Sequence, residues 1–89
     1  WGYQLCAYLA DQVTLEQLLA VAQKTGDAEG GTAVAQQRLC EAHFFAGQKA
    51  LLAKNTVAAK EHFQQSIKTK AFNLAAYRGS RFQLGEFPK

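Results

Sequence analysis

The segment CEAHFFAGQKALLAKNTVAAKEHFQQSI, residues 40–67, decides the fold of this 89-residue chain. In its first half, apolar or small residues recur at steps of four, three and four, the spacing that keeps side chains on one face of an α-helix. These residues are Cys40, Phe44, Gly47 and Leu51. Ala59, Phe63 and Ile67 repeat the pattern in the second half. The segment therefore predicts two consecutive helices.

The break between the two helices is Lys54-Asn55-Thr56. Asn55 or Thr56 can accept a hydrogen bond from the free N–H groups that open the second helix. A connection this short makes the two helices antiparallel neighbours. We expect Gly47 to face inward, where its missing side chain lets the second helix come close, with Ala59 and Phe63 filling the space opposite.

This hairpin resembles a tetratricopeptide (TPR) repeat. Gly47, Ala59 and Phe63, at spacings of twelve and four, stand where that family has its small-small-aromatic signature. The departures are His43 for the usual Trp, Ser66 for the usual Ala, Lys54 for the turn Gly, and the absence of the closing Pro. The resemblance implies stacked antiparallel hairpins, with the best-defined repeat at residues 33–67.

A wider resemblance covers nearly the whole chain. Trp1, TLEQLLAVA, a Gly-rich gap, LCEAHFFAGQKALL, AAKEHFQQSI and FNLAAYR follow one another as in the C-terminal half of TPR-containing bacterial lipoproteins related to new lipoprotein I. This similarity implies a helical adaptor without catalytic residues, located in the bacterial periplasm or at the outer membrane. We expect residues 1–89 to be one helical domain and an excerpt of a longer solenoid.

Local signals extend the helical pattern in both directions. Residues 1–10 are expected to be the tail of a helix, and Thr14 and Gln17 form a capping box for the next helix, with Val13 and Leu18 as a hydrophobic staple. Its buried stripe is expected to be Leu15, Leu18, Leu19 and Ala22. Gly26 is expected to end this helix, residues 25–32 to form a loop, and Thr32 to cap a long helix from about Ala33 to Ala53.

The last predicted helix runs from Leu74 to about Leu84, with Asn73 as its cap and Gly85 as its stop. One side of it would carry Leu74, Tyr77, Arg81 and Leu84. No segment alternates apolar and polar residues with period two, and the single proline is Pro88. The sequence predicts an all-α fold of about five helices.

Composition fits a folded protein, with 48% hydrophobic and 19% charged residues, and no apolar run approaches the ~20 residues of a membrane span. The net charge of +3 is uneven: residues 1–41 carry two cationic against five acidic side chains, whereas residues 42–89 carry eight against two. This asymmetry suits a solvated helix surface and leaves open an acidic partner. The aromatic and arginine residues at 77–82 are interleaved as in surfaces that stack on bases, and nucleic-acid binding is kept as a minority alternative.

Two cysteines and two histidines are the side chains closest to metal or redox chemistry. Cys6 and Cys40 match no redox or zinc spacing and are read as buried thiols, with a disulfide or metal ligation left open. His43 follows Cys40 by three residues, so one helix face could offer two metal ligands, but His43 is read as a packing residue. We expect the chain to bind no cofactor and no metal ion.

No pattern of catalytic residues stands out. Glu41 and Glu61 are isolated on opposite helices, and Ser66 and Ser80 have no base nearby in the sequence. By resemblance to TPR repeats, a peptide or helix would bind in a concave groove lined by Glu41, Phe44, Phe45, Gln48 and Leu52. Phe44 and Phe45 point about 100° apart, so one of them is available to a partner unless the helices on either side cover both.

The sequence thus favours a non-catalytic module that binds other proteins, with self-association as one form of that binding. Two alternatives remain: a purely structural segment of a larger solenoid, and an accessory domain of an enzyme whose active site lies outside these residues.

Overall fold

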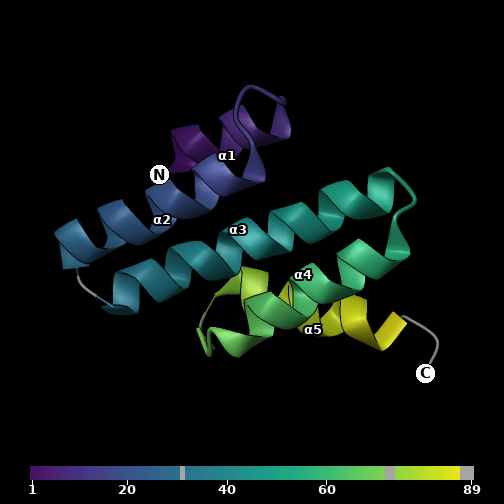
Figure 1. The fold of residues 1–89 in the computed structure, drawn as a ribbon. Coiled ribbons are helices and arrows are strands. Elements are labelled where there is room, and N and C mark those ends of the chain that lie inside the picture. The colour runs from purple at the N-terminus through teal and green to yellow at the C-terminus, as the bar shows by residue number, and fades with distance from the viewer. Residues whose placement is uncertain (31, 72–73, 87–89) are drawn as a thin grey trace.

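The computed structural model describes residues 1–30, 32–71 and 74–86, and all regular structure in these ranges is helical. Five helices follow one another (Figure 1): α1 (Gly2–Leu9), α2 (Leu15–Gly30), α3 (Thr32–Leu52), α4 (Thr56–Lys68) and α5 (Ala75–Glu86). The predicted all-α fold of about five helices is confirmed, and the described ranges contain no strand.

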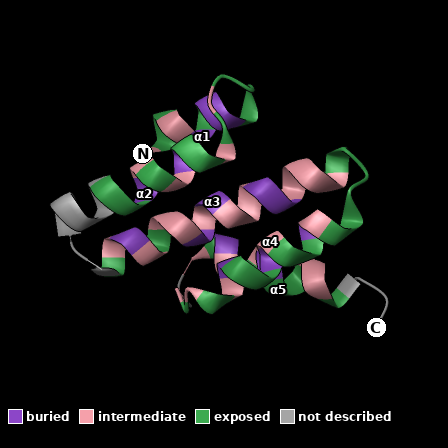
Figure 2. Ribbon diagram, viewed as in Figure 1, coloured by how far each residue is buried: buried purple, intermediate pink, exposed green. Residues whose placement is uncertain are grey.

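The longest helix, α3, lies at the centre. Helices α1 and α2 lie on one side of it and α4 and α5 on the other (Figure 1). Its 21 residues span about 30 Å at 1.5 Å per residue, so both neighbouring pairs can pack along it. Buried residues recur along its length (Figure 2), as this position requires.

The side of α3 toward α1 and α2 carries Ala42 and Ala46, which join the main hydrophobic core. The other buried members are Leu5, Tyr8 and Leu18. Leu18 and Ala22 are buried and Leu15 and Leu19 half-buried, so the predicted stripe of α2 is confirmed. Alanines on α3 allow close contact with these larger side chains.

The side of α3 toward α4 depends on a missing side chain. A Cβ placed on Gly47 would lie 2.6 Å from Cε1 of Phe63, well inside van der Waals contact. Phe63 and Ala59 are fully buried. The prediction that Gly47 lets the second helix of the hairpin approach closely is therefore confirmed.

A second glycine–phenylalanine contact, which the sequence analysis did not predict, joins α5 to α3. A Cβ placed on Gly79 would lie 2.6 Å from Cε1 of Phe44. The rings of Phe44 and Phe63 have centroids 6.1 Å apart, so the two glycine contacts share one aromatic cluster. Helices α3, α4 and α5 thus meet around these two rings.

Two predicted helix starts are confirmed by their hydrogen bonds. The backbone N–H of Gln17 donates to Oγ1 of Thr14 at 3.2 Å, and the N–H of Thr14 donates to Oε1 of Gln17 at 2.8 Å. At α4, Oδ1 of Asn55 accepts from the N–H of Ala58 at 3.2 Å. Lys54, just before this cap, has φ of 61°, the left-handed conformation that glycine adopts most easily.

The predicted loop at residues 25–32 is wrong for the residues described. Helix α2 continues through Gly26 to Gly30, and α3 already begins at Thr32, which is helical and not a preceding cap. Glycine permits a helix to stop but does not force it, because its cost inside a helix is only about 1 kcal/mol relative to alanine. Packing of α2 along α3 offsets a cost of that size.

The last helix also differs from its prediction. α5 begins at Ala75 and continues through Gly85 to Glu86, and Asn73 lies outside the described residues. Its buried residues are Ala76 and Ser80, whereas the predicted face of Leu74, Tyr77, Arg81 and Leu84 is half-buried or, at Arg81, exposed. Small side chains face inward because Phe44 reaches the α5 backbone at Gly79.

Candidate functional site

A partly exposed stripe runs along α3 between its two buried sides. Four of the five predicted groove residues recur there at steps of four, three and four, so they share one face of the helix. They are Glu41, Phe45, Gln48 and Leu52, and we call them the α3 stripe. The first three are half-buried, and Leu52 at the helix end is 87% exposed. The stripe therefore has carboxylate, aromatic, amide and aliphatic side chains, of which Leu52 is the most exposed.

The fifth predicted residue, Phe44, does not belong to this stripe. It lies on the side toward α4 and α5, where it contacts Gly79 and Phe63. Phe45 packs on the other side, against the core cluster that holds Leu5 and Tyr8. Both phenylalanines are half-buried, so neighbouring helices cover each ring only in part. Phe45 remains partly exposed and belongs to the stripe.

Away from the stripe, α3 and α4 bring the two histidines together. Nδ1 of His43 lies 3.3 Å from Nδ1 of His62, while the ring centroids are 5.5 Å apart. The two nitrogens therefore lie between the centroids, and the rings meet edge to edge. One ring donates its Nδ1–H to the unprotonated Nδ1 of the other, which requires different tautomers in the two rings.

Burial and mutual proximity keep this pair uncharged. Burial, and then the neighbouring His62, lower the pKa of His43 from 6.5 to about 4. Burial also lowers the pKa of His62, against an opposing effect of Glu61. Both rings are consequently neutral at pH 7. The sequence reading of His43 as a packing residue fits its half-buried position, but it missed the contact with His62.

Cys40 does not join the histidines, although it lies one turn from His43. Its Sγ is 3.1 Å from Oγ of Ser66, and that hydroxyl donates to the backbone oxygen of Cys40 at 2.9 Å. Both residues are fully buried. Cys40 and Cys6 are free thiols, and Cys6 is exposed on α1, unlike its prediction as a buried residue. A disulfide does not link them.

Lys49 on α3 ties down the end of α1. Its Nζ donates to the backbone oxygen of Tyr8 at 2.9 Å, pairs with the carboxylate of Asp11, and lies 4.3 Å from the centroid of the Tyr8 ring. A cation is favourable at a helix C-terminus, where carbonyl oxygens lack partners. Burial raises the pKa of Tyr8, so its hydroxyl stays protonated. The contact fixes α1 beside the α3 stripe.

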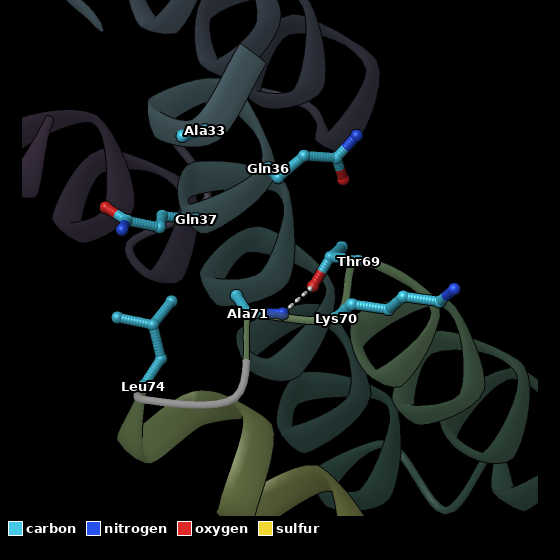
Figure 3. A pocket seen from close by; sticks show the side chains of 7 residues that line it. All are labelled: Ala33, Gln36, Gln37, Thr69, Lys70, Ala71 and Leu74. Carbon is cyan, nitrogen blue, oxygen red and sulfur yellow. Dashed lines mark hydrogen bonds between the residues drawn. The ribbon is translucent and has the colours of Figure 1, made fainter.

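Two open hollows flank α3. One, of about 350 Å³, lies between the start of α3 and the connection after α4 (Figure 3). Its lining residues are Ala33, Gln36, Gln37, Thr69, Lys70, Ala71 and Leu74. In Figure 3 the side chain of Lys70 extends away from the others, and the Thr69 hydroxyl accepts from the N–H of Ala71 at 3.4 Å. The hollow offers amides and small apolar groups, without a charged group pointing inward.

The second hollow, of about 420 Å³, lies where α1 turns into α2. Its lining includes the Thr14 and Gln17 capping pair and Lys49 with Asp11. Their polar groups already bond one another. A ligand there would compete with the bonds that hold α1 and α2 in place.

In the part of the chain described, the acid–base pair of His43 and His62 and the nucleophilic groups of Cys40 and Ser66 form two separate contacts between α3 and α4. The Ser66 hydroxyl is used in the contact with Cys40. Oγ of Ser80, on α5, is buried and has no hydrogen-bond partner among the described residues. Within the described ranges no three His, Cys, Asp or Glu side chains group together to hold a metal ion. None of the helices in these ranges has the length and apolarity of a bilayer span.

Comparisons with protein-family models, with curated proteins and with solved structures found no match to this chain.

Proposed function

We propose that this chain is a non-catalytic protein-interaction module that holds an apolar or helical peptide segment against the α3 stripe. The observation that carries the proposal is the position of Glu41, Phe45, Gln48 and Leu52 on one partly exposed face of the central helix. A guest helix commonly binds through residues one turn apart, and a stripe with the same period offers matching contacts.

The chemistry of the stripe supports a peptide as the guest. Phe45 and Leu52 supply apolar surface, and Gln48 between them can both donate and accept hydrogen bonds from a peptide backbone. The resemblance to TPR repeats points to the same face of the same helix. Because α1 is fixed to α3 through Lys49, the surface beside the stripe is preformed, which lowers the entropy cost of binding.

A displayed library of random peptides, selected on the purified chain, tests this proposal. The affinity of a selected peptide is then compared for the unmodified chain and for Gln48→Lys, Leu52→Asp and Gln64→Lys. Gln64 is exposed on α4, so Gln64→Lys introduces the same charge outside the stripe. We expect about a tenfold loss, or roughly 1.4 kcal/mol, for each stripe variant and no change for Gln64→Lys. Equal effects at Gln48 and Gln64, or a library without binders, would refute the proposal.

A structural role in a larger helical array is the second candidate function. It is supported by large apolar side chains that are exposed on the first and last helices, Tyr3 and Leu9 on α1 and Phe82 on α5. In this case the chain should self-associate in sedimentation velocity, and Tyr3→Ser with Phe82→Ser should abolish the association. The Leu52→Asp variant should then associate normally, which separates the two functions.

A further inference from the structure

The pair of histidines between α3 and α4 lies outside the α3 stripe and has no part in the proposed function. We propose that His43 and His62 bind one divalent transition-metal ion of the class that favours neutral imidazole, such as Zn²⁺, through their two Nδ1 atoms, with water completing the coordination. This proposal departs from the expectation, drawn from the sequence, that the chain holds no metal.

The spacing of the two nitrogens carries the proposal. Zinc–imidazole bonds of about 2.0–2.1 Å in a tetrahedron place two ligand nitrogens about 3.3–3.4 Å apart. The observed Nδ1–Nδ1 distance is 3.3 Å. The helix pair that sets this distance is held by the Gly47–Phe63 contact one turn away, so the ligands are already at coordination spacing before an ion arrives.

Binding requires only local changes in the rings. Without an ion, one ring donates its Nδ1–H to the other. With an ion, that proton moves to Nε2 of its own ring, and both Nδ1 lone pairs become available. The two rings then tilt about their side-chain torsions so that the lone pairs meet at the ion. Both rings start and finish neutral, so binding at pH 7 releases no net proton from the pair.

The surroundings leave room for an ion with few protein ligands. His43 and His62 are both half-buried, so solvent reaches one side of the pair and can supply water ligands. Cys40 cannot act as a third ligand while its thiol faces Ser66. Imidazole nitrogens suit zinc and copper, and neutral rings present no charge that would repel the cation.

The experiment uses the full chain with Cys6→Ser as parent, because the exposed thiol of Cys6 is a competing zinc ligand. Isothermal titration with ZnCl2 at pH 7.5 is performed on the parent, on His43→Gln and on His62→Gln. The chain has only these two histidines, so each variant leaves a single imidazole. Glu61→Gln serves as the matched control, since it removes the carboxylate beside His62 and retains both rings.

We expect one zinc ion per parent chain, and at least about a tenfold loss of affinity in either histidine variant. Glu61→Gln should retain binding. Circular dichroism without metal checks that each variant remains helical. No binding by the parent, binding that survives either histidine substitution, or loss of binding in Glu61→Gln would overturn the proposal.

A measurement on the parent alone avoids any dependence on folding of the variants. Long-range ¹H–¹⁵N spectra resolve the two nitrogens of each imidazole ring. Zinc should shift the Nδ1 resonances of both rings and leave both Nε2 atoms protonated. Unchanged Nδ1 signals, or coordination through Nε2, would exclude this geometry.

Discussion

Replacing Gly47 by alanine tests the close contact between α3 and α4. In an exposed helix interior, Gly→Ala stabilises by up to about 1 kcal/mol. At Gly47 the new Cβ would lie 2.6–2.8 Å from three ring atoms of Phe63, which is fully buried and cannot move aside. Overpacking of this kind costs about 1–3 kcal/mol. We therefore expect Gly47→Ala to destabilise the fold by about 1–2 kcal/mol, and Gly47→Leu by more.

The chain offers two matched controls for this substitution. Gly85 on α5 has no atom within 4 Å of an added Cβ, so Gly85→Ala should stabilise by up to about 1 kcal/mol. Gly79 faces the far end of the Phe44 ring, which is only half-buried and can shift. Gly79→Ala should therefore fall between the other two variants in stability.

Urea denaturation followed by circular dichroism at 222 nm measures these differences as changes in midpoint at constant slope. Phe63→Leu combined with Gly47→Ala completes a double-mutant cycle, and the pair should cost less than the two single changes together. If Gly47→Ala raised the midpoint as Gly85→Ala does, the contact between Gly47 and Phe63 would not exist as described.

Three further predictions concern local features. Burial lowers the pKa of His43 from 6.5 in the unfolded chain to about 4 in the fold. The free energy of unfolding should therefore be highest above pH 6.5 and fall as the pH drops toward 4. After allowance for partial exposure the loss is about 1–2 kcal/mol, and titrating stability in His43→Gln should remove that part of the slope. Lys54→Gly should raise the free energy of unfolding by about 1 kcal/mol, because φ of 61° strains a lysine; a lower urea midpoint would contradict this. Lys49→Met keeps the aliphatic stem but loses the bonds to Tyr8 and Asp11. Hydrogen exchange should then show that the free energy of opening α1 is lower by about 0.5–2 kcal/mol. Equal protection of α1 in both proteins would refute that role.

The parts of the fold that sequence predicted well depend on local chemistry or on one strong pattern. The Thr14–Gln17 pair and the Asn55 cap depend on residues within one turn, so their hydrogen bonds can be predicted from the local sequence. The Gly47–Phe63 contact follows from helical period and a short turn. Each of these needs no knowledge of distant residues.

The errors arose where long-range packing outweighed local preference. The sequence predicts helix ends at Gly26 and Gly85, although a glycine stops a helix only when nothing favours its continuation. In α5 the sequence pattern places large apolar residues in the interior, whereas the contact with Phe44 requires the small residue Gly79 there. That preference is set by a ring 35 positions earlier in the chain.

The histidine pair could have been predicted from the same register. In an antiparallel hairpin with Gly47 opposite Ala59, the residue one turn before Gly47 lies opposite the residue one turn after Ala59. His43 is thereby placed beside residues 62 and 63, and Cys40 beside Ser66. The tautomers and the 3.3 Å spacing could not be predicted, because they depend on ring orientation in the folded chain.

Phe44 packs against Gly79 of α5 and Gly47 packs against Phe63 of α4, yet Phe44 and Gly47 are only three residues apart on α3. Inserting or deleting one residue between them would rotate one contact by about 100° relative to the other, so α4 and α5 could not both stay docked. Insertions and deletions should therefore not be tolerated between these two positions.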